Sequence, residues 1–166
     1  MNTLSDKEIS LLVELLNKCE PGNLSPEVFE AVARIAVYPA VEFIPLRKKE
    51  GRIEVLLLER SADDLIWPSM LHTPGTILRP TDNTMEAAFS RLFSDELSGL
   101  STKTPVFIGA HLSRNSRGAC ILLEHIVEVI SEPLDGAFYD VENLPSQFIS
   151  EQVASLRRAV AIYKLQ

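Results

Sequence analysis

The stretch TPGTILRPTDNTMEAAFSRLFSDELSGL, residues 73–100, is the part of the chain that decides the fold. It opens with a Pro-Gly turn ending at Gly75, and its second half has the spacing and composition of a helix over 84–97. Asn83, with Glu86 three residues later, matches the capping-box pattern that starts helices. A turn followed by a capped helix is therefore predicted at the centre of the chain.

One face of this predicted helix carries acidic residues. Leu92, Asp95 and Glu96 share that face, because residues three and four apart are neighbours on a helix. Carboxylates placed this way can hold a hard cation such as Mg²⁺, which takes oxygen ligands and binds substrate phosphates alongside water. Gly75 lacks a side chain, so its backbone carbonyl can approach a metal or a phosphate. The pattern predicts metal ligation by Glu96, Asp95 and Gly75, and the alternative is an exposed acidic patch at a helix end.

Strand-like runs flank this helix on both sides in the sequence. They cover residues 40–46, 52–60, 105–112, 119–130 and 137–141. A last helix is predicted over 149–165. Strands interleaved with helices indicate the α/β (α+β) class, as an α/β/α sandwich with a mixed β-sheet. We expect helix 84–97 on one face of this sheet and the C-terminal helix on the other.

The beginning of the chain has a helical pattern instead. Ser5 opens a capping box, and Ser25 is followed by a proline at the first position of a second helix. We therefore expect an N-terminal helical extension over 1–38 and a single domain over 39–166. The apolar faces of these helices must be buried on the domain or on a second copy, so the extension is predicted to contribute to a homodimer.

Composition excludes several classes of protein. The chain has 166 residues, 46% of them hydrophobic, which is enough for one globular domain with a proper core. A net charge of -7 argues against sequence-independent binding to nucleic acid. Cys19 and Cys120 lack the spacing of a metal site or disulfide scaffold, so both are expected to be free and buried. No signal-like or membrane-spanning segment is present in the sequence, and a cytoplasmic location is expected.

The central stretch resembles a degenerate Nudix box, whose family pattern is G-x5-E-x7-R-E-U-x-E-E-x-G-U, with U a bulky aliphatic residue. Arg91 matches the family arginine, and Asp95 and Glu96 stand at the paired acids. Asn83 replaces the first glutamate of the pattern and Leu92 replaces the second. The glycines at the two ends are displaced, so each end carries an insertion. The lead-in VLLLERSADDLIWPSMLHTPG is also similar to the family's strand, loop, Trp and Pro-Gly.

The resemblance covers about residues 41–165 and implies the Nudix fold. It also implies hydrolysis of a nucleoside diphosphate linked to another group, with Mg²⁺ or Mn²⁺ as cofactor. The segment TMEAAFSRLFSDEL looks most like GDP-mannose mannosyl hydrolases, which have Arg-Leu in place of Arg-Glu. In that group the glutamate at the position of Glu96 holds Mg²⁺, and a histidine on a distant loop is the general base.

Further candidates come from the rest of the chain. Catalytic roles are predicted for Glu96, Arg91 and His111, and substrate binding for Arg114, Arg117 and His72. The segment HLSRNSRGA is expected to be a loop between two strands, where arginines beside a phosphate site suit a diphosphate. A solvated hairpin loop explains it equally well.

Three of these residues have a structural alternative. Arg91 can pair with Asp95 one turn later and orient it. Asn83 is most simply a helix cap, and His72 can be a loop histidine that makes one backbone hydrogen bond.

Three functions therefore remain open from the sequence. The first is a metal-assisted hydrolase acting on a nucleoside diphosphate linked to another moiety, such as a nucleotide sugar. The second is a catalytically inactive Nudix-fold module that binds nucleotides or regulates a partner. The third is a purely structural, partner-binding domain that uses its N-terminal helices for self-association. The fold alone does not choose among them.

Overall fold

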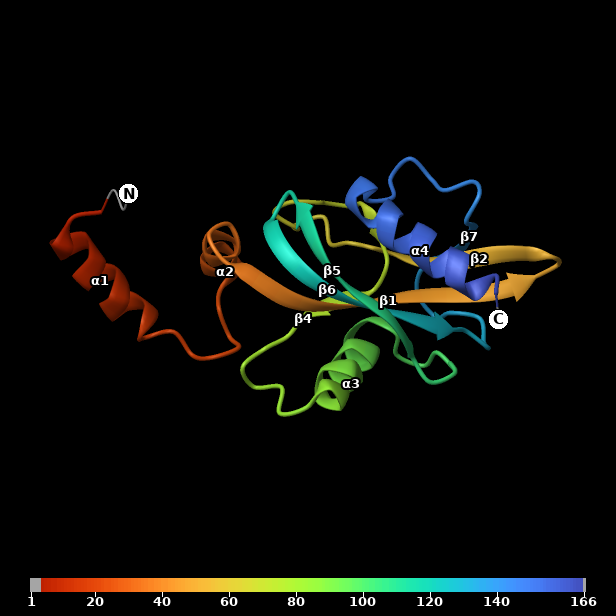
Figure 1. The fold of residues 1–166 in the computed structure, drawn as a ribbon, viewed down its shortest axis with the longest axis horizontal. Coiled ribbons are helices and arrows are strands. Elements are labelled where there is room, and N and C mark those ends of the chain that lie inside the picture. Colours follow the sequence, from red (N-terminus) through yellow and green to blue (C-terminus); the bar gives the residue numbers. More distant parts are fainter. Residues whose placement is uncertain (1–3, 166) are drawn as a thin grey trace.

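The computed structural model describes residues 4–165 and consists of a mixed β-sheet covered by helices on both faces (Figure 1). The strands are β1 (Val37–Lys49), β2 (Arg52–Glu59), β3 (Leu71–His72), β4 (Gly75–Ile77), β5 (Val106–Asn115), β6 (Gly118–Glu128) and β7 (Ala137–Asp140). The helices are α1 (Asp6–Leu16), α2 (Pro26–Ala33), α3 (Met85–Glu96), the 3-10 turn η1 (Ser150–Gln152) and α4 (Val153–Tyr163). The predicted mixed sheet between helices is confirmed.

The long strand β1 is the centre of the sheet, whose order is β3-β2-β1-β6-β5. It runs parallel to β6 along its length and antiparallel to β2 at its far end, where Leu46 pairs with Val55. Near its start β1 pairs with the short strand β4, with Ala40 opposite Ile77. The β1–β2 turn has positive φ at Glu50 and Gly51. A two-residue hairpin turn needs this conformation to match the twist of its strands.

Alternation along the strands sends side chains to two separate cores. On the α4 face, Ile44 and Ile126 pack against Leu156 and Tyr163. On the α3 face, Phe43 belongs to a second cluster with the helix's own apolar side chains. Figure 1 shows α3 and α4 on opposite sides of the sheet, as predicted.

The two N-terminal helices differ in how they contact this body. In α2, Phe29 packs edge-on against Tyr38 of β1, with ring centroids 5.7 Å apart. The end of α2 approaches the β5–β6 turn so closely that a Cβ on Gly118 would lie 2.3 Å from the carbonyl oxygen of Ala33. Helix α1 buries none of its residues and extends away from the sheet (Figure 1). Its capping box at Ser5 is present as predicted.

Several local predictions need correction. Helix α3 begins at Met85, and its cap is Thr84, whose hydroxyl accepts the N–H of Ala87, instead of Asn83. The segment 61–83, where no strand was predicted, contains β3 and β4, which are too short to leave an alternating pattern. Cys120 is buried as expected, whereas Cys19 is only partly buried. Among the described residues, no helix is long and apolar enough to cross a membrane.

Candidate functional site

The last turn of α3 brings Glu96 against the Pro-Gly turn. One carboxylate oxygen, Oε2, accepts the backbone N–H of Gly75 at 3.2 Å. Only a residue without a side chain fits easily there, because a Cβ on Gly75 would lie 3.2 Å from the carbonyl oxygen of Val41. Burial raises the pKa of Glu96 to about 7, although the Gly75 N–H and the charge of Arg60 act in the opposite direction.

The other two positions of the predicted acidic face, 92 and 95, have different surroundings. Leu92 is 1% exposed and packs in the core with Val41 and Phe43. Asp95 is exposed to solvent. Position 92 therefore belongs to the α3 core, and a carboxylate there would be buried among apolar side chains.

Arg91 lies on another side of the helix and has a structural role. Its guanidinium makes two hydrogen bonds to Asp82, with Nη2 2.6 Å from Oδ2, and it donates to the hydroxyl of Thr76 and the carbonyl of Ile77. The expected pairing with Asp95 is therefore wrong. Arg91 ties the loop before α3 to strand β4, since it contacts both.

The segment expected to be a cationic loop is mostly strand. His111 and Arg114 lie within β5, and only Arg117 occupies the turn to β6. His111 sits 3.6 Å from the buried Glu124 and does not line the cavity described below, and Arg114 is exposed. Arg117 alone of these residues faces that cavity, where its Nε donates to Glu30 of α2 at 2.6 Å.

A cavity of about 110 Å³ opens on the α4 face of the sheet. Its floor comes from three neighbouring strands, because alternate residues of each point to the same side. The floor residues are Tyr38, Ala40 and Glu42 of β1, Ser113 and Asn115 of β5, and Cys120 and Leu122 of β6. Its walls include Trp67, Ile149, Glu151 and Gln152, and we call this space the sheet cavity.

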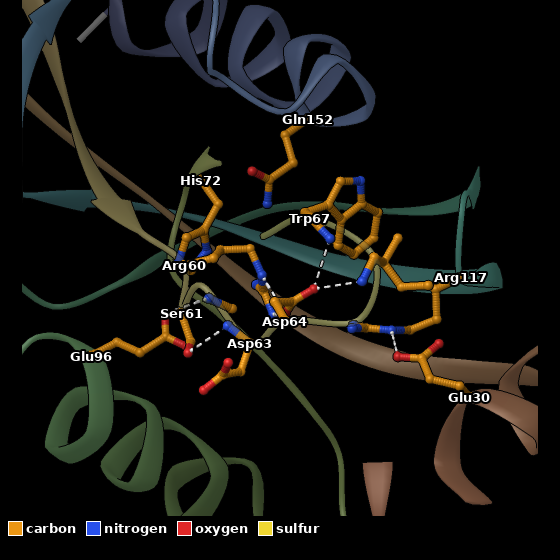
Figure 2. A network of polar contacts seen from close by, with 12 residues as sticks. Glu30, Arg60, Ser61, Asp63, Asp64, Trp67, His72, Glu96, Arg117 and Gln152 are labelled. Atoms are coloured by element: carbon orange, nitrogen blue, oxygen red, sulfur yellow. Dashed lines mark hydrogen bonds and ion pairs between the residues drawn. The ribbon is translucent and has the colours of Figure 1, made fainter. Parts of the chain in front are cut away.

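A second, more charged space adjoins the sheet cavity. It has a volume of about 420 Å³ and is lined by acids that include Asp63, Asp95, Glu96 and Asp135. We call it the acidic hollow. The side chains that line both spaces are Arg60, His72 and Arg117. Figure 2 shows Arg60, Asp64 and Trp67 between Glu96 at one end and Arg117 at the other.

The loop between these spaces is held by Asp64. Its Oδ1 accepts the backbone N–H groups of Ile66 and Trp67, and its Oδ2 accepts Nε of Arg60 at 2.8 Å. Partial burial acts to raise the pKa of Asp64, but these hydrogen bonds outweigh that effect and lower the pKa to about 2. Both Arg60 and Arg117 approach the ring of Trp67, at 5.7 and 5.1 Å from its centroid. The arginines are thus fixed around the single tryptophan.

His72 combines the two roles weighed for it. It is 6% exposed, lines both spaces and bonds through Nδ1 to the carbonyl of Thr73 at 2.9 Å. A carbonyl only accepts, so Nδ1 carries the proton and Nε2 is a free acceptor. Burial, with Arg60 nearby, lowers the pKa of His72 to about 4, so the ring is neutral at physiological pH.

The donor atoms fit a metal only in part. Within residues 4–165, no three His, Cys, Asp or Glu side chains are grouped so as to hold a metal ion. Asp95 and Glu96 offer two carboxylates, and Gly75 presents its N–H to Glu96. Mg²⁺ often binds through one or two carboxylates, with waters and substrate phosphates completing its shell. This set suits a cation that arrives with a phosphate ligand, and it does not suit one held by the protein alone.

The sequence pointed to Glu96, Asp95, Gly75, Arg117 and His72, which the structure brings around the two spaces. Glu42, Arg60, Trp67 and Gln152 were missed as site residues. A signal existed for Glu42, which is an acid inside the apolar run AVEFIPL. Gln152 exchanges hydrogen bonds with the backbone of Thr73, and only the folded chain brings these distant residues together.

No protein-family profile and no curated protein matches this sequence. Solved structures do match. A MutT/nudix family protein from Listeria innocua aligns with a TM-score of 0.58 at 14% identity, covering 77% of this chain and 94% of the other. A C. elegans Ap4A hydrolase gives 0.56 at 15% identity, covering 77% and 99%. The NUDIX domain of Shewanella oneidensis NrtR, complexed with ADP ribose, gives 0.54 at 14% identity, covering 98% and 100%. At these identities the likeness establishes the architecture, and the fold of this chain is the Nudix fold.

Proposed function

We propose that this chain is a Nudix-type hydrolase that binds a nucleoside diphosphate linked to another group, with Mg²⁺ arriving together with the substrate. Nucleotide sugars are one member of this class. The observation that carries the proposal is the junction of the two spaces, where Arg60, His72 and Arg117 line both. Solved proteins of the same fold include an Ap4A hydrolase and an ADP-ribose complex, which supports a nucleotide-type ligand.

The two spaces suit the two ends of such a ligand. The sheet cavity, with Ala40, Leu122 and Trp67, offers apolar surface for a ring. The diphosphate would lie at the junction against Arg60 and Arg117. Each guanidinium has five N–H donors and uses only part of them on Asp64 or Glu30, so donors remain for phosphate oxygens.

The hydrolytic step would be supported from the acidic hollow. When bound, Mg²⁺ would polarise a phosphate oxygen and lower the pKa of a coordinated water. Glu96 would meet the cation with the carboxylate oxygen that the Gly75 N–H leaves free, with Asp95 beside it. His72 would accept a hydrogen bond at Nε2 from the ligand or a water.

A substrate screen tests this function. ADP-ribose, Ap4A and nucleotide sugars would be incubated with Mg²⁺ or Mn²⁺, and the products followed by chromatography. We expect metal-dependent cleavage of at least one of them, lost in Glu96→Gln, which keeps size but removes the charge. Glu86→Gln, at an exposed position in the first turn of the same helix, is the matched control and should keep activity. Metal-independent cleavage, or full activity of Glu96→Gln, would contradict the proposal.

A second function is favoured by the apolar environment of position 92. Leu92 lies in the core and Asn83 replaces another family acid, so the site has fewer carboxylates than the full motif. If the screen finds a nucleotide that binds but none that is cleaved, the chain is a nucleotide-binding or regulatory module without hydrolytic activity. The free thiols of Cys19 and Cys120 support a cytoplasmic location for either function.

A further inference from the structure

Glu42 is a buried acid with one oxygen that has no partner. Its side chain lies at the floor of the sheet cavity and is 2% exposed. Oε1 accepts the hydroxyl of Thr73 at 2.7 Å. Oε2 is buried and makes no hydrogen bond among residues 4–165. A buried acceptor without a donor is costly, so this atom calls for a partner from outside the chain.

The neighbouring strand carries a second buried glutamate that serves as a comparison. Glu124 of β6 pairs with Glu42 across the β1–β6 ladder and is fully buried on the same face. Its oxygens are occupied, because Ser155 donates to Oε1 at 2.7 Å and Arg158 Nε donates to Oε2 at 3.0 Å. The fold thus supplies partners for both oxygens of Glu124 and leaves Oε2 of Glu42, a residue of the cavity floor, without one.

The cavity has room for more than a water molecule. A single water needs roughly 10–15 Å³ of such space, whereas this cavity has about 110 Å³. Next to Glu42 its floor is the small Ala40 and the apolar Leu122, and Trp67 lies among its walls. A flat ring with one polar edge fits these surroundings, since apolar surface can contact its faces while the edge meets Glu42.

We propose that Glu42 recognises the nucleobase of the ligand, accepting an N–H of the exocyclic amine of adenine or cytosine on its free oxygen. This rests on the proposed function and names the base within it. Because Thr73 occupies Oε1, the carboxylate offers one open acceptor and does not match the two adjacent N–H donors of guanine. The N–H of uracil lies between two carbonyls, which would face the carboxylate unfavourably.

The hydrogen bond from Thr73 also fixes how a glutamine at position 42 would be oriented. In Glu42→Gln, the Thr73 hydroxyl holds the amide oxygen at the position of Oε1 and directs the NH₂ to the position of Oε2. The open acceptor becomes a donor. Adenine presents an amine at C6 and hypoxanthine a carbonyl, so the wild type should prefer ADP and the variant IDP.

Trp67 provides the readout, as the single tryptophan of the chain and a wall of the cavity. Its fluorescence would be titrated with ADP, IDP and purine riboside 5′-diphosphate, which has no C6 substituent. Titrations run with Mg²⁺ at pH 8, above the Glu42 pKa of about 7 that burial causes. We expect the wild type to bind ADP about tenfold or more tighter than either analogue, and Glu42→Gln to bind IDP at least as tightly as ADP.

Glu124→Gln is the matched control, since it changes a buried acid on the same face that does not line the cavity. It should keep the wild-type order. Equal binding of all three nucleotides by the wild type, or an ADP preference retained by Glu42→Gln, would overturn the role of Glu42 and leave the proposed function standing. Binding of none of them by any variant would overturn both.

Discussion

The two faces of the central sheet differ in what they bury. On the α3 face, Leu92 packs with apolar and aromatic side chains, and the buried His125 lies edge-on against Phe43 and Phe89. On the α4 face, two acids are buried: Glu42 at the floor of the sheet cavity, and Glu124 opposite it on β6. The helix that resembles the family motif therefore contributes mainly packing, with Asp95 and Glu96 at its end as the exceptions. The polar interior lies on the opposite face, and four substitutions or deletions can test this contrast.

The largest effect is expected from Leu92→Glu. A carboxylate at a position that is 1% exposed and surrounded by apolar side chains should cost on the order of 4 kcal/mol or more of the unfolding free energy. Urea denaturation measures this cost. The control is Leu92→Met, which conserves volume and should cost less than about 1.5 kcal/mol. A Leu92→Glu variant with native stability that also gains Mn²⁺ binding would show that position 92 faces the acidic hollow.

A smaller and pH-dependent effect is expected from Glu42→Gln. Burial raises the pKa of Glu42 from 4.5 to about 7. A raised folded pKa means that the stability this group contributes is fully present below pH 4.5 and is lost as pH rises through 7. Glutamine removes that loss, so the variant should be more stable than the wild type at pH 8 by at most on the order of 3 kcal/mol, and similar at pH 4. Thermal or urea unfolding at the two pH values decides, and a gain of equal size at both would contradict a buried, titrating carboxylate.

Arg91→Lys should have an effect of about 1–2 kcal/mol, because lysine cannot reproduce the fork that contacts Asp82, Thr76 and Ile77 together. Nucleotide affinity should change little, since Arg91 does not line either space. Urea unfolding of the Arg91→Lys variant measures the effect on stability, and nucleotide titration of the same variant measures the effect on affinity. Lost binding with unchanged stability would give Arg91 the catalytic role first predicted for it.

The smallest effect on stability is expected from deleting residues 1–22, which removes α1 and keeps α2. Helix α1 buries none of its residues, so unfolding of the domain should change by less than about 0.5 kcal/mol. An isolated helix of this length is marginal in water, which is why we predict that α1 contributes to a homodimer. Light scattering should then report a smaller mass after deletion. A monomeric mass before and after would remove the dimer prediction.

The fold was largely predictable from the sequence, because long periodic segments such as 119–130 and a capped central helix leave strong patterns. Short strands such as β3 and β4 depend on pairing with β2 and β1, so two or three residues carry no signal of their own. The site was only partly predictable. Glu96 and Gly75 follow from a motif, whereas Arg91 found a partner in Asp82, outside the helix. The sheet cavity combines residues from distant segments, and no local spacing reveals it.

The most direct test of the proposed ligand site fills the sheet cavity without altering a polar group. Leu122→Trp places a large ring on the cavity floor, and Leu112→Trp places the same ring on an exposed site of β5. ADP-ribose would be titrated calorimetrically, with Mg²⁺, into the wild type and both variants after circular dichroism has compared their folds. We expect binding to the wild type and to Leu112→Trp, and none to a folded Leu122→Trp. Equal binding by all three proteins would contradict a nucleotide seated in the sheet cavity.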